Sequence, residues 1–97
     1  MPAMGATATP LGDEHGFRLT EWRLPPSTST GWHVHELPYT VVPLTDGLMR
    51  IETPDGWIDF PIEAGAPYSR PAGVEHDVHN GGDTEIRFIE VEARLPS

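Results

Sequence analysis

Short runs of alternating apolar and polar residues, separated by turn residues, make up most of this 97-residue chain. Alternation with a period of two is typical of β-strands that bury one face. The turn signals TDG, PDG and NGGD divide several of the runs. The runs lie at residues 16–24, 32–37, 39–44, 48–53, 57–62 and 85–95. Together with the stretch 65–80, about eight short strands predict an all-β sandwich or barrel.

The length of 97 residues is enough for one domain with a single core. Residues 1–15 are small, polar and proline-containing, so the sequence predicts an N-terminal arm there and one barrel domain over residues 16–97. The arm is either a loosely ordered tail or, in a dimer, a strand that adds to a neighbour's sheet. Because only 37% of the residues are hydrophobic, burial in a monomer is marginal, and we expect a homodimer that shares sheet edges.

Acidic residues outnumber basic residues by 15 to 6, which gives a formal charge of −9. This charge repels phosphate backbones, so nucleic acid is not an expected partner. The absence of cysteine excludes disulfides, thiolate ligands and a cysteine nucleophile. No apolar run approaches the length of a membrane span, and residues 1–12 lack the pattern of a signal peptide. We therefore expect a cytoplasmic protein with no membrane partner.

Two histidines in the segment GWHVH are the first candidates for chemistry. His33 and His35 are two residues apart, so in a strand both side chains leave the same face and can bind one ion. An H-x-H pair by itself is weak evidence for a metal site, because such histidines are more often surface or core residues than ligands. Neutral imidazole suits zinc, iron, nickel and copper.

A second stretch, GAPYSRPAGVEHDVHN at residues 65–80, supports the interpretation of this pair as metal ligands. It fits the pattern G-x5-P-x-G-x2-H-x3-N at every fixed position, namely Gly65, Pro71, Gly73, His76 and Asn80. This is the second motif of the cupin superfamily, which the chain resembles from Gly16 onward. The resemblance implies a double-stranded β-helix, or jelly-roll barrel, in which His76 joins His33 and His35 on a divalent metal ion such as iron, zinc, nickel or manganese. Within the motif, Pro71 and Gly73 are expected to shape the turn that aims His76 inward, and Asn80 to cap the next turn.

A narrower resemblance is to the small single-domain cupins known as beta-alanine degradation proteins. It implies a role near a three-carbon amino acid or its oxo-acid product. The matching stretches are TGWHVH (30–35), YTVVPLTDG (39–47), YSRPAGVEHDVHN (68–80) and FIEVE (88–92).

The chain departs from the first cupin motif, G-x5-H-x-H-x3/4-E-x6-G, at two positions. Ser27 stands where the motif has glycine, and Tyr39 or Thr40 stands where it has the ligand glutamate. Alternation places Tyr39 on the histidine face. A phenol is a poor ligand at neutral pH, so we expect a three-histidine site with Tyr39 as a hydrogen-bond donor or an occasional fourth ligand.

Two carboxylates near these positions are weaker candidates. Glu36 is expected to point away from the histidine face. Glu90 faces inward only if the last strand is in register through Ile86 and Phe88. The competing register buries Ile89 and Val91 instead.

Tyr68 and Arg70 fall where cupins usually place inward-facing apolar residues. An arginine there is costly unless it is paired. In one interpretation Arg70 clamps a substrate carboxylate while Tyr68 hydrogen-bonds beside it. In the other, Arg70 forms a structural ion pair with Glu90 or Glu52.

The sequence therefore predicts an all-β cupin that binds a small anionic molecule. The first hypothesis is a metal-dependent enzyme for a small carboxylate or oxo-acid, acting as a dioxygenase, isomerase or lyase such as a decarboxylase, with Tyr39, Tyr68 and Arg70 in the catalytic site. The alternative is a non-catalytic cupin that binds a small anion. A scaffold that has lost its metal is a third possibility, because the motif glutamate is missing.

Overall fold

Nine β-strands and no helix make up the part of the chain described by the computed structural model, residues 5–94. All pairs of neighbouring strands are antiparallel, which confirms the all-β prediction. In chain order the strands are β1 (Thr7–Glu14), β2 (Phe17–Leu24), β3 (His33–Val34), β4 (Tyr39–Pro43), β5 (Gly47–Thr53), β6 (Gly56–Ile62), β7 (Tyr68–Arg70), β8 (Glu75–Asn80) and β9 (Ile86–Ala93). Within these residues no helix is long and apolar enough to span a membrane.

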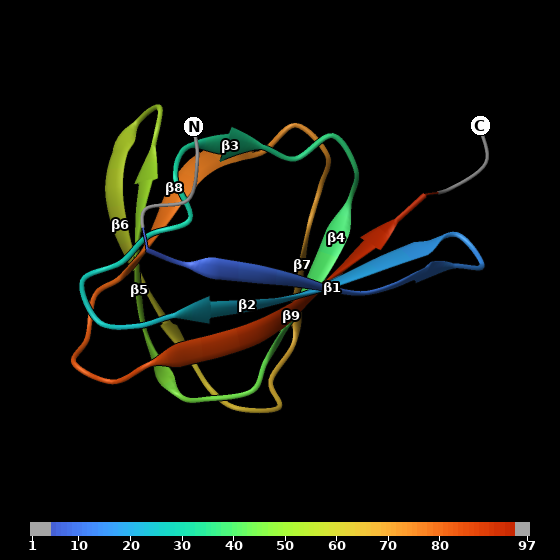
Figure 1. Ribbon diagram of the computed structural model, residues 1–97. Coiled ribbons are helices and arrows are strands. Elements are labelled where there is room, and N and C mark those ends of the chain that lie inside the picture. The colour runs from blue at the N-terminus through green and yellow to red at the C-terminus, as the bar shows by residue number, and fades with distance from the viewer. Residues whose placement is uncertain (1–4, 95–97) are drawn as a thin grey trace.

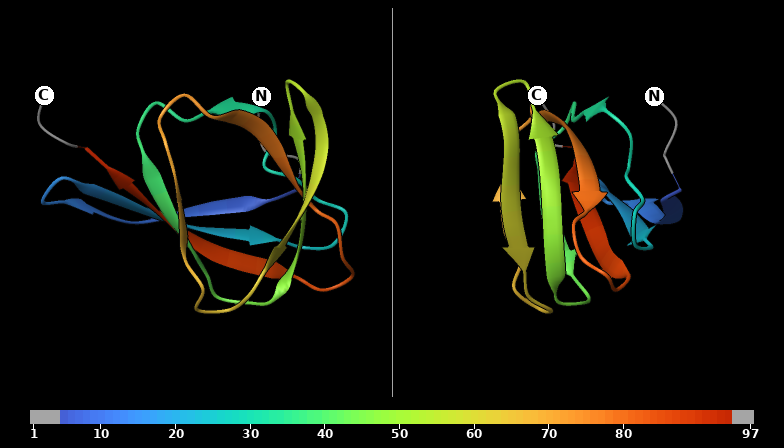
Figure 2. Two further views of the ribbon diagram at one scale, coloured as in Figure 1. Left: turned by 180° about the vertical axis from the view of Figure 1, so that it is seen from behind. Right: turned by 90° about the vertical axis from the view of Figure 1, so that its left-hand side faces the viewer.

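Two sheets face each other and enclose the core (Figure 1). One has five strands in the order β1-β2-β9-β4-β7, and the other has four in the order β3-β8-β5-β6. Figure 2 shows β6, β5 and β8 side by side across the second sheet. This arrangement confirms the predicted jelly-roll barrel.

The core lies between the sheets and comes from alternate residues of the strands. Its buried apolar members are Leu24, Tyr39, Val41, Met49, Ile51, Ile62, Val78, Ile86 and Phe88. In β9 the buried positions are Ile86, Phe88, Glu90 and Glu92, whereas Ile89 and Val91 are half-buried. The register through Ile86 and Phe88 is therefore correct, and the competing register is wrong.

The segment predicted as an arm contains a strand of this chain's own sheet. Strand β1 pairs with β2 along its length, with a bulge between Pro10 and Gly12. The β1–β2 hairpin extends beyond the barrel together with the end of β9 (Figure 1). The division into residues 1–15 and 16–97 stays a prediction, and residues 1–4 lie outside the described part of the chain.

Large apolar side chains remain exposed on the single chain. Leu11, Val34, Trp57 and Ile58 are each about half exposed. Such surface fits the expected homodimer, which stays a prediction.

Two turns depend on left-handed backbone conformations. Gly73, in the turn before β8, has a φ of 95°, which glycine adopts without strain. Ser27 has a φ of 66°, at the position where the first cupin motif has glycine. The serine therefore occupies a conformation that costs a residue with a Cβ about 1–2 kcal/mol.

Asn80 closes the turn after β8 with three side-chain hydrogen bonds. Its amide Nδ2 donates to the carbonyls of Leu24 (2.8 Å) and Thr84 (2.7 Å), and its Oδ1 accepts from the Gly82 N–H at 2.9 Å. The side chain is buried, so these bonds replace water that cannot reach it. The predicted capping role of Asn80 is confirmed.

We expect Asn80→Ala to lower the free energy of unfolding by about 2–4 kcal/mol, because it leaves buried carbonyls and an N–H without partners. Urea unfolding measures the change. Asp83→Ala, an exposed change in the same turn, serves as the control and should cost little. An equal loss in both variants would contradict a specific role for the Asn80 amide.

Candidate metal and substrate site

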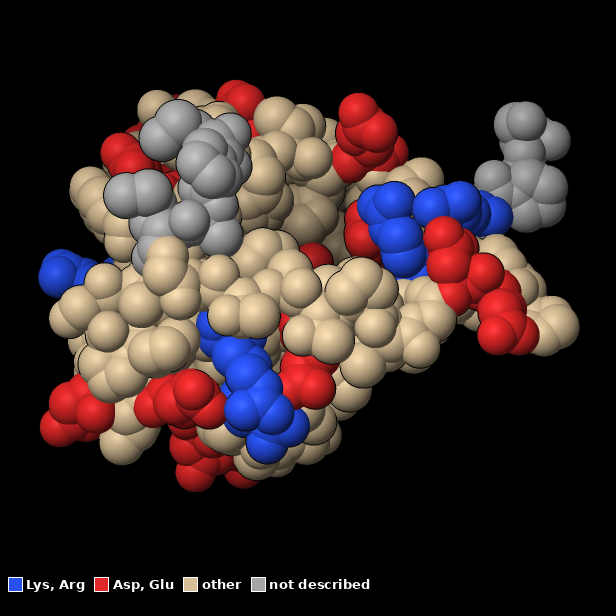
Figure 3. All heavy atoms as spheres, in the orientation of Figure 1, with Lys and Arg blue, Asp and Glu red and all other residues tan. Residues whose placement is uncertain are grey.

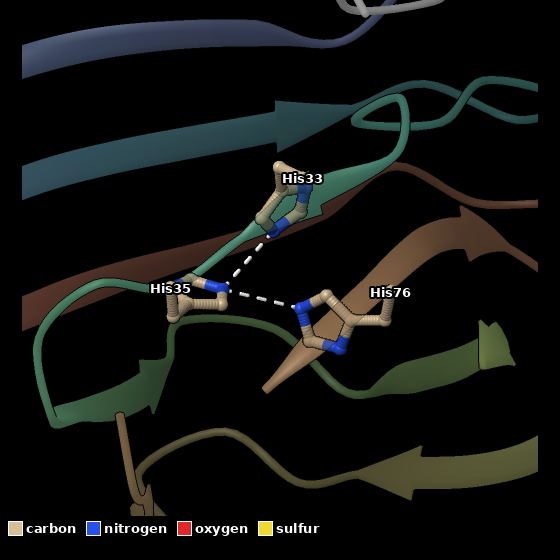
Figure 4. Close-up of side chains that lie close together, drawn as sticks. All are labelled: His33, His35 and His76. Atoms are coloured by element: carbon tan, nitrogen blue, oxygen red, sulfur yellow. Dashed lines mark hydrogen bonds between the residues drawn. The ribbon is translucent and has the colours of Figure 1, made fainter. Parts of the chain in front are cut away.

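Three histidine side chains converge at one end of the barrel interior (Figure 4). The Nε2 atoms of His33 and His35 are 3.0 Å apart, and those of His35 and His76 are 3.2 Å apart. His35 and His76 are buried, and His33 is half-buried. The structure thus brings together the three residues that the sequence singled out as ligands.

Backbone hydrogen bonds between the two motifs hold these side chains in place. His33 and His76 are opposite each other in the β3–β8 pair. Just beyond β3, the His35 N–H donates to the Val74 carbonyl at 2.8 Å, and the Gly73 N–H donates to the His35 carbonyl at 2.7 Å. Gly73 has a left-handed φ of 95° in this turn, which glycine adopts without strain.

A neighbouring carbonyl fixes the tautomer of His33. Its Nδ1 lies 2.8 Å from the Gly31 carbonyl oxygen. Since a carbonyl can only accept, Nδ1 carries the proton and Nε2 keeps its lone pair directed at the other histidines. A carbonyl on the far ring nitrogen is the usual support for a histidine that binds a metal.

The spacing of the nitrogens fits a transition-metal ion. Metal–nitrogen bonds of about 2.0–2.1 Å place adjacent ligand atoms roughly 2.8–3.4 Å apart, from octahedral to tetrahedral geometry. The observed distances of 3.0 and 3.2 Å fall in that range. Facing lone pairs repel one another unless a proton or a cation lies between them, so this donor set suits a divalent ion.

Burial keeps two of these histidines neutral at physiological pH. Burial, with a smaller contribution from His33, lowers the pKa of His35 to about 4. Burial, together with His33, His35 and Arg70, lowers the pKa of His76 to about 3. Neutral imidazole is the form that binds metals, so the pair is ready to bind without losing protons.

The same shifts predict acid sensitivity of the chelator-treated protein. Below pH 6.5 the unfolded chain protonates His35 and His76 while the folded chain does not, so acid favours unfolding. Burial raises the pKa of Glu90 from 4.5 to about 7, and its protonation in the fold offsets one of those two protons. We expect stability to fall by about 1.4 kcal/mol per pH unit between roughly pH 6.5 and 4.5.

Urea unfolding across that range measures the slope. In His76→Gln the remaining contributions of His35 and Glu90 cancel, so the slope should nearly vanish. An equal slope in both proteins would contradict the assignment.

Tyr39 lies against the site as the sequence predicted. Its ring stacks on the His35 ring with centroids 3.8 Å apart. Burial raises the pKa of Tyr39 to about 12, so the phenol stays protonated. It is therefore suited to donate a hydrogen bond more than to bind a metal.

Glu90 is the residue whose place the sequence left undecided. It is buried, its Oε2 lies 3.9 Å from His35 Nε2, and the Trp22 indole N–H donates to its Oε1 at 3.1 Å. Burial raises its pKa to about 7, which suits a group that takes up and releases protons near neutral pH. Glu36, in contrast, is exposed, as predicted.

Tyr68 and Arg70 line a cavity of about 530 Å³ between the sheets, and His76, Tyr39 and Glu90 line it as well. The Tyr68 ring packs edge-on against Phe60, and its hydroxyl lies 3.6 Å from the Met49 sulfur. Burial raises the pKa of Tyr68, so its hydroxyl is a donor. Arg70 is exposed and lies opposite Tyr39 in the β4–β7 pair.

Within residues 5–94, Arg70 differs from the other arginines in having no carboxylate partner. Each of the other five forms an ion pair within 4.0 Å, which is why most blue groups adjoin red ones in Figure 3. Across residues 5–94 no such pair joins Arg70 to Glu90, Glu52 or any other carboxylate. The structural ion pair considered from the sequence is therefore not formed.

A second group of ligand-type side chains lies on the outer face of the four-stranded sheet. Glu52, Asp77 and His79 place their ligand atoms within 4.8 Å of one another, and the Trp57 ring lies 5.0 Å from that of His79. His79 Nε2 is 3.3 Å from an Asp77 oxygen. His79 is three residues after His76 in β8, so the two side chains face opposite sides of the sheet.

Known proteins resemble this chain in sequence and in structure. The family profile described as "Cupin domain" matches residues 20–92. The Beta-alanine degradation protein BauB of Pseudomonas aeruginosa is 49% identical over 76 residues, which cover 78% of this chain and 80% of that protein. An oxalate-binding protein of Thermotoga maritima is 32% identical over 71 residues, covering 71% of this chain and 55% of that protein.

Among solved structures, a cupin domain from Bordetella pertussis superimposes with a TM-score of 0.91 at 44% identity, covering 98% of this chain and 99% of the other. The polyketide cyclase RemF of Streptomyces resistomycificus matches with a TM-score of 0.78 at 27% identity, covering 97% of this chain and 69% of that chain. On this likeness of sequence and fold, the chain belongs to the cupin family.

Proposed function

We propose that this protein is a metal-dependent enzyme for a small carboxylate or oxo-acid, in which His33, His35 and His76 hold one divalent ion. The observation that carries the proposal is the convergence of three Nε2 atoms beside a cavity, with distances of 3.0 and 3.2 Å. An iron, zinc, nickel or manganese ion on three neutral imidazoles would keep its full charge and polarise an anionic oxygen.

The chain's own residues supply the remaining functions. Arg70 binds the substrate carboxylate, because its guanidinium lines the cavity and has no carboxylate partner within residues 5–94. Tyr68 orients the substrate beside it. Tyr39 donates a hydrogen bond, and Glu90 accepts or returns a proton with a pKa of about 7.

Turnover by the metal-loaded protein tests this proposal. The substrates are 3-oxopropanoate, beta-alanine and simple diketones, since one relative is a beta-alanine degradation protein. Each is assayed under air and without oxygen, with oxygen uptake and product formation as readouts. Oxygen uptake that disappears in His76→Ala supports a dioxygenase, whereas conversion without oxygen supports an isomerase or lyase.

A second candidate is a cupin that binds a small anion without converting it. The 32% identity to an oxalate-binding protein favours it. Tight binding of an acid by the metal-loaded protein, with no conversion of any substrate under either atmosphere, would make this candidate the better one.

A further inference from the structure

The cavity between the sheets is much larger than a three-carbon acid requires. Its volume is about 530 Å³, within the range of sites that hold larger organic ligands. Pyruvate and 3-oxopropanoate each have six non-hydrogen atoms, which fill less than half of that volume even at the roughly 30 Å³ that a water molecule occupies in the liquid. Volume therefore favours a longer ligand.

The walls of the cavity are mostly apolar, which favours the same conclusion. Most of the apolar lining residues come from strands of both sheets, among them Val41, Met49, Ile51, Ile58, Phe60 and Phe88. Water against such walls makes few hydrogen bonds, whereas a hydrocarbon chain or ring buries its own surface there. A small hydrophilic acid would leave this surface unused.

The charged lining residues limit the ligand to one carboxylate. Arg70 is the only cationic side chain among the described residues that line the cavity. Asp55 and Glu75 are exposed acidic lining residues, and Glu90 lies deeper inside. A second carboxylate on the ligand would meet these groups and be repelled.

These observations extend the proposed function, on which the inference rests. We propose that the substrate is an amphipathic monocarboxylate, an oxo-acid with an apolar chain or ring and about ten to fifteen non-hydrogen atoms in all. Arg70 binds the carboxylate, the oxo group faces the histidines, and the apolar part lies against the side chains of β5 and β6.

Binding of stable 2-oxo acids by the metal-loaded protein tests the inference by calorimetry. The series is pyruvate, 2-oxopentanoate, 2-oxooctanoate and phenylpyruvate. We expect affinity to rise about fourfold for each methylene that is buried, and at least a hundredfold from pyruvate to 2-oxooctanoate. Affinities within threefold of one another across the series, or no binding by any member, would overturn the inference.

A variant of the cavity wall provides a second readout. Ile58 lines the cavity and is 50% exposed, so Ile58→Ser should fold normally. We expect it to weaken 2-oxooctanoate binding about three- to tenfold and to leave pyruvate binding unchanged. The matched control is Leu11→Ser, because Leu11 is 49% exposed and lies outside the cavity lining. Equal effects of Ile58→Ser on both acids, or none on either, would count against an apolar subsite.

The same titrations on chelator-treated protein separate the two proposals. If the chain-length trend persists without metal, the substrate class stands even where the metal-dependent reaction fails. If metal binds and turnover occurs but affinity does not rise with chain length, the substrate class is wrong and the proposed function remains.

Discussion

Replacing His76 with alanine is expected to reduce metal content from about one ion per chain to near zero and to remove any turnover. Two ligands remain after the change, and loss of one of three should weaken metal binding by more than about a hundredfold. Elemental analysis of protein purified without added ions measures the content. The barrel should remain folded, because the change relieves the packing of three facing imidazoles.

Two histidine variants make this result specific. His15 is exposed in the β1–β2 turn with a φ of 56°, a conformation that asparagine tolerates, so His15→Asn should bind metal normally. His79→Ala removes a member of the outer cluster and should also leave the content unchanged. If metal is lost in His79→Ala and kept in His76→Ala, the outer cluster is the metal site and the assignment of the interior histidines is wrong.

Replacing Arg70 with methionine is expected to weaken the binding of carboxylate ligands about ten- to hundredfold, the value of a charge-assisted pair of hydrogen bonds. Metal content and unfolding midpoint should not change, because Arg70 is exposed and has no carboxylate within ion-pair distance in residues 5–94. Calorimetry with a carboxylate and with its uncharged amide measures the effect, which should be confined to the acid.

The matched control is Arg50→Met. Arg50 is also exposed, but it pairs with Asp59 at 3.2 Å and does not line the cavity. Equal weakening in both variants would indicate that the net charge of the protein, and not a direct contact between Arg70 and the carboxylate, controls binding. Unfolding of Arg70→Met alone would show that Arg70 is structural.

The fold was predictable because period-two alternation and turn residues report directly on strands with one buried face. Strand β1 was missed for the same reason. Its sequence TATPLGDE is almost entirely exposed, so no alternation marks it. It is a strand because β2 offers it backbone partners, which a local pattern cannot reveal.

The histidine cluster was predictable because His33 and His35 share a face and the second motif supplies His76. The inward position of Glu90 was not predictable. Apolar and other residues alternate in both possible registers of β9, which differ only in the face that they turn toward the other sheet. Pairing with β2 decides between them, and it places Trp22 where its indole can bond Glu90. One sequence signal could have decided the register of β9. The neighbouring strand β2 carries side chains that can donate hydrogen bonds to inward-facing carboxylates of β9.

The shortness of β3 has a consequence for local motion. Only two residues form this strand at the edge of the four-stranded sheet, yet it and the residue after it supply two of the three histidines. Few backbone hydrogen bonds resist its opening, so an ion held there would add its binding energy mainly to this segment. Amide hydrogen exchange in residues 33–35 would then respond to metal far more than exchange in the long β2–β9 pair. Binding of the ion and pairing of β3 with the rest of the sheet would then be thermodynamically coupled.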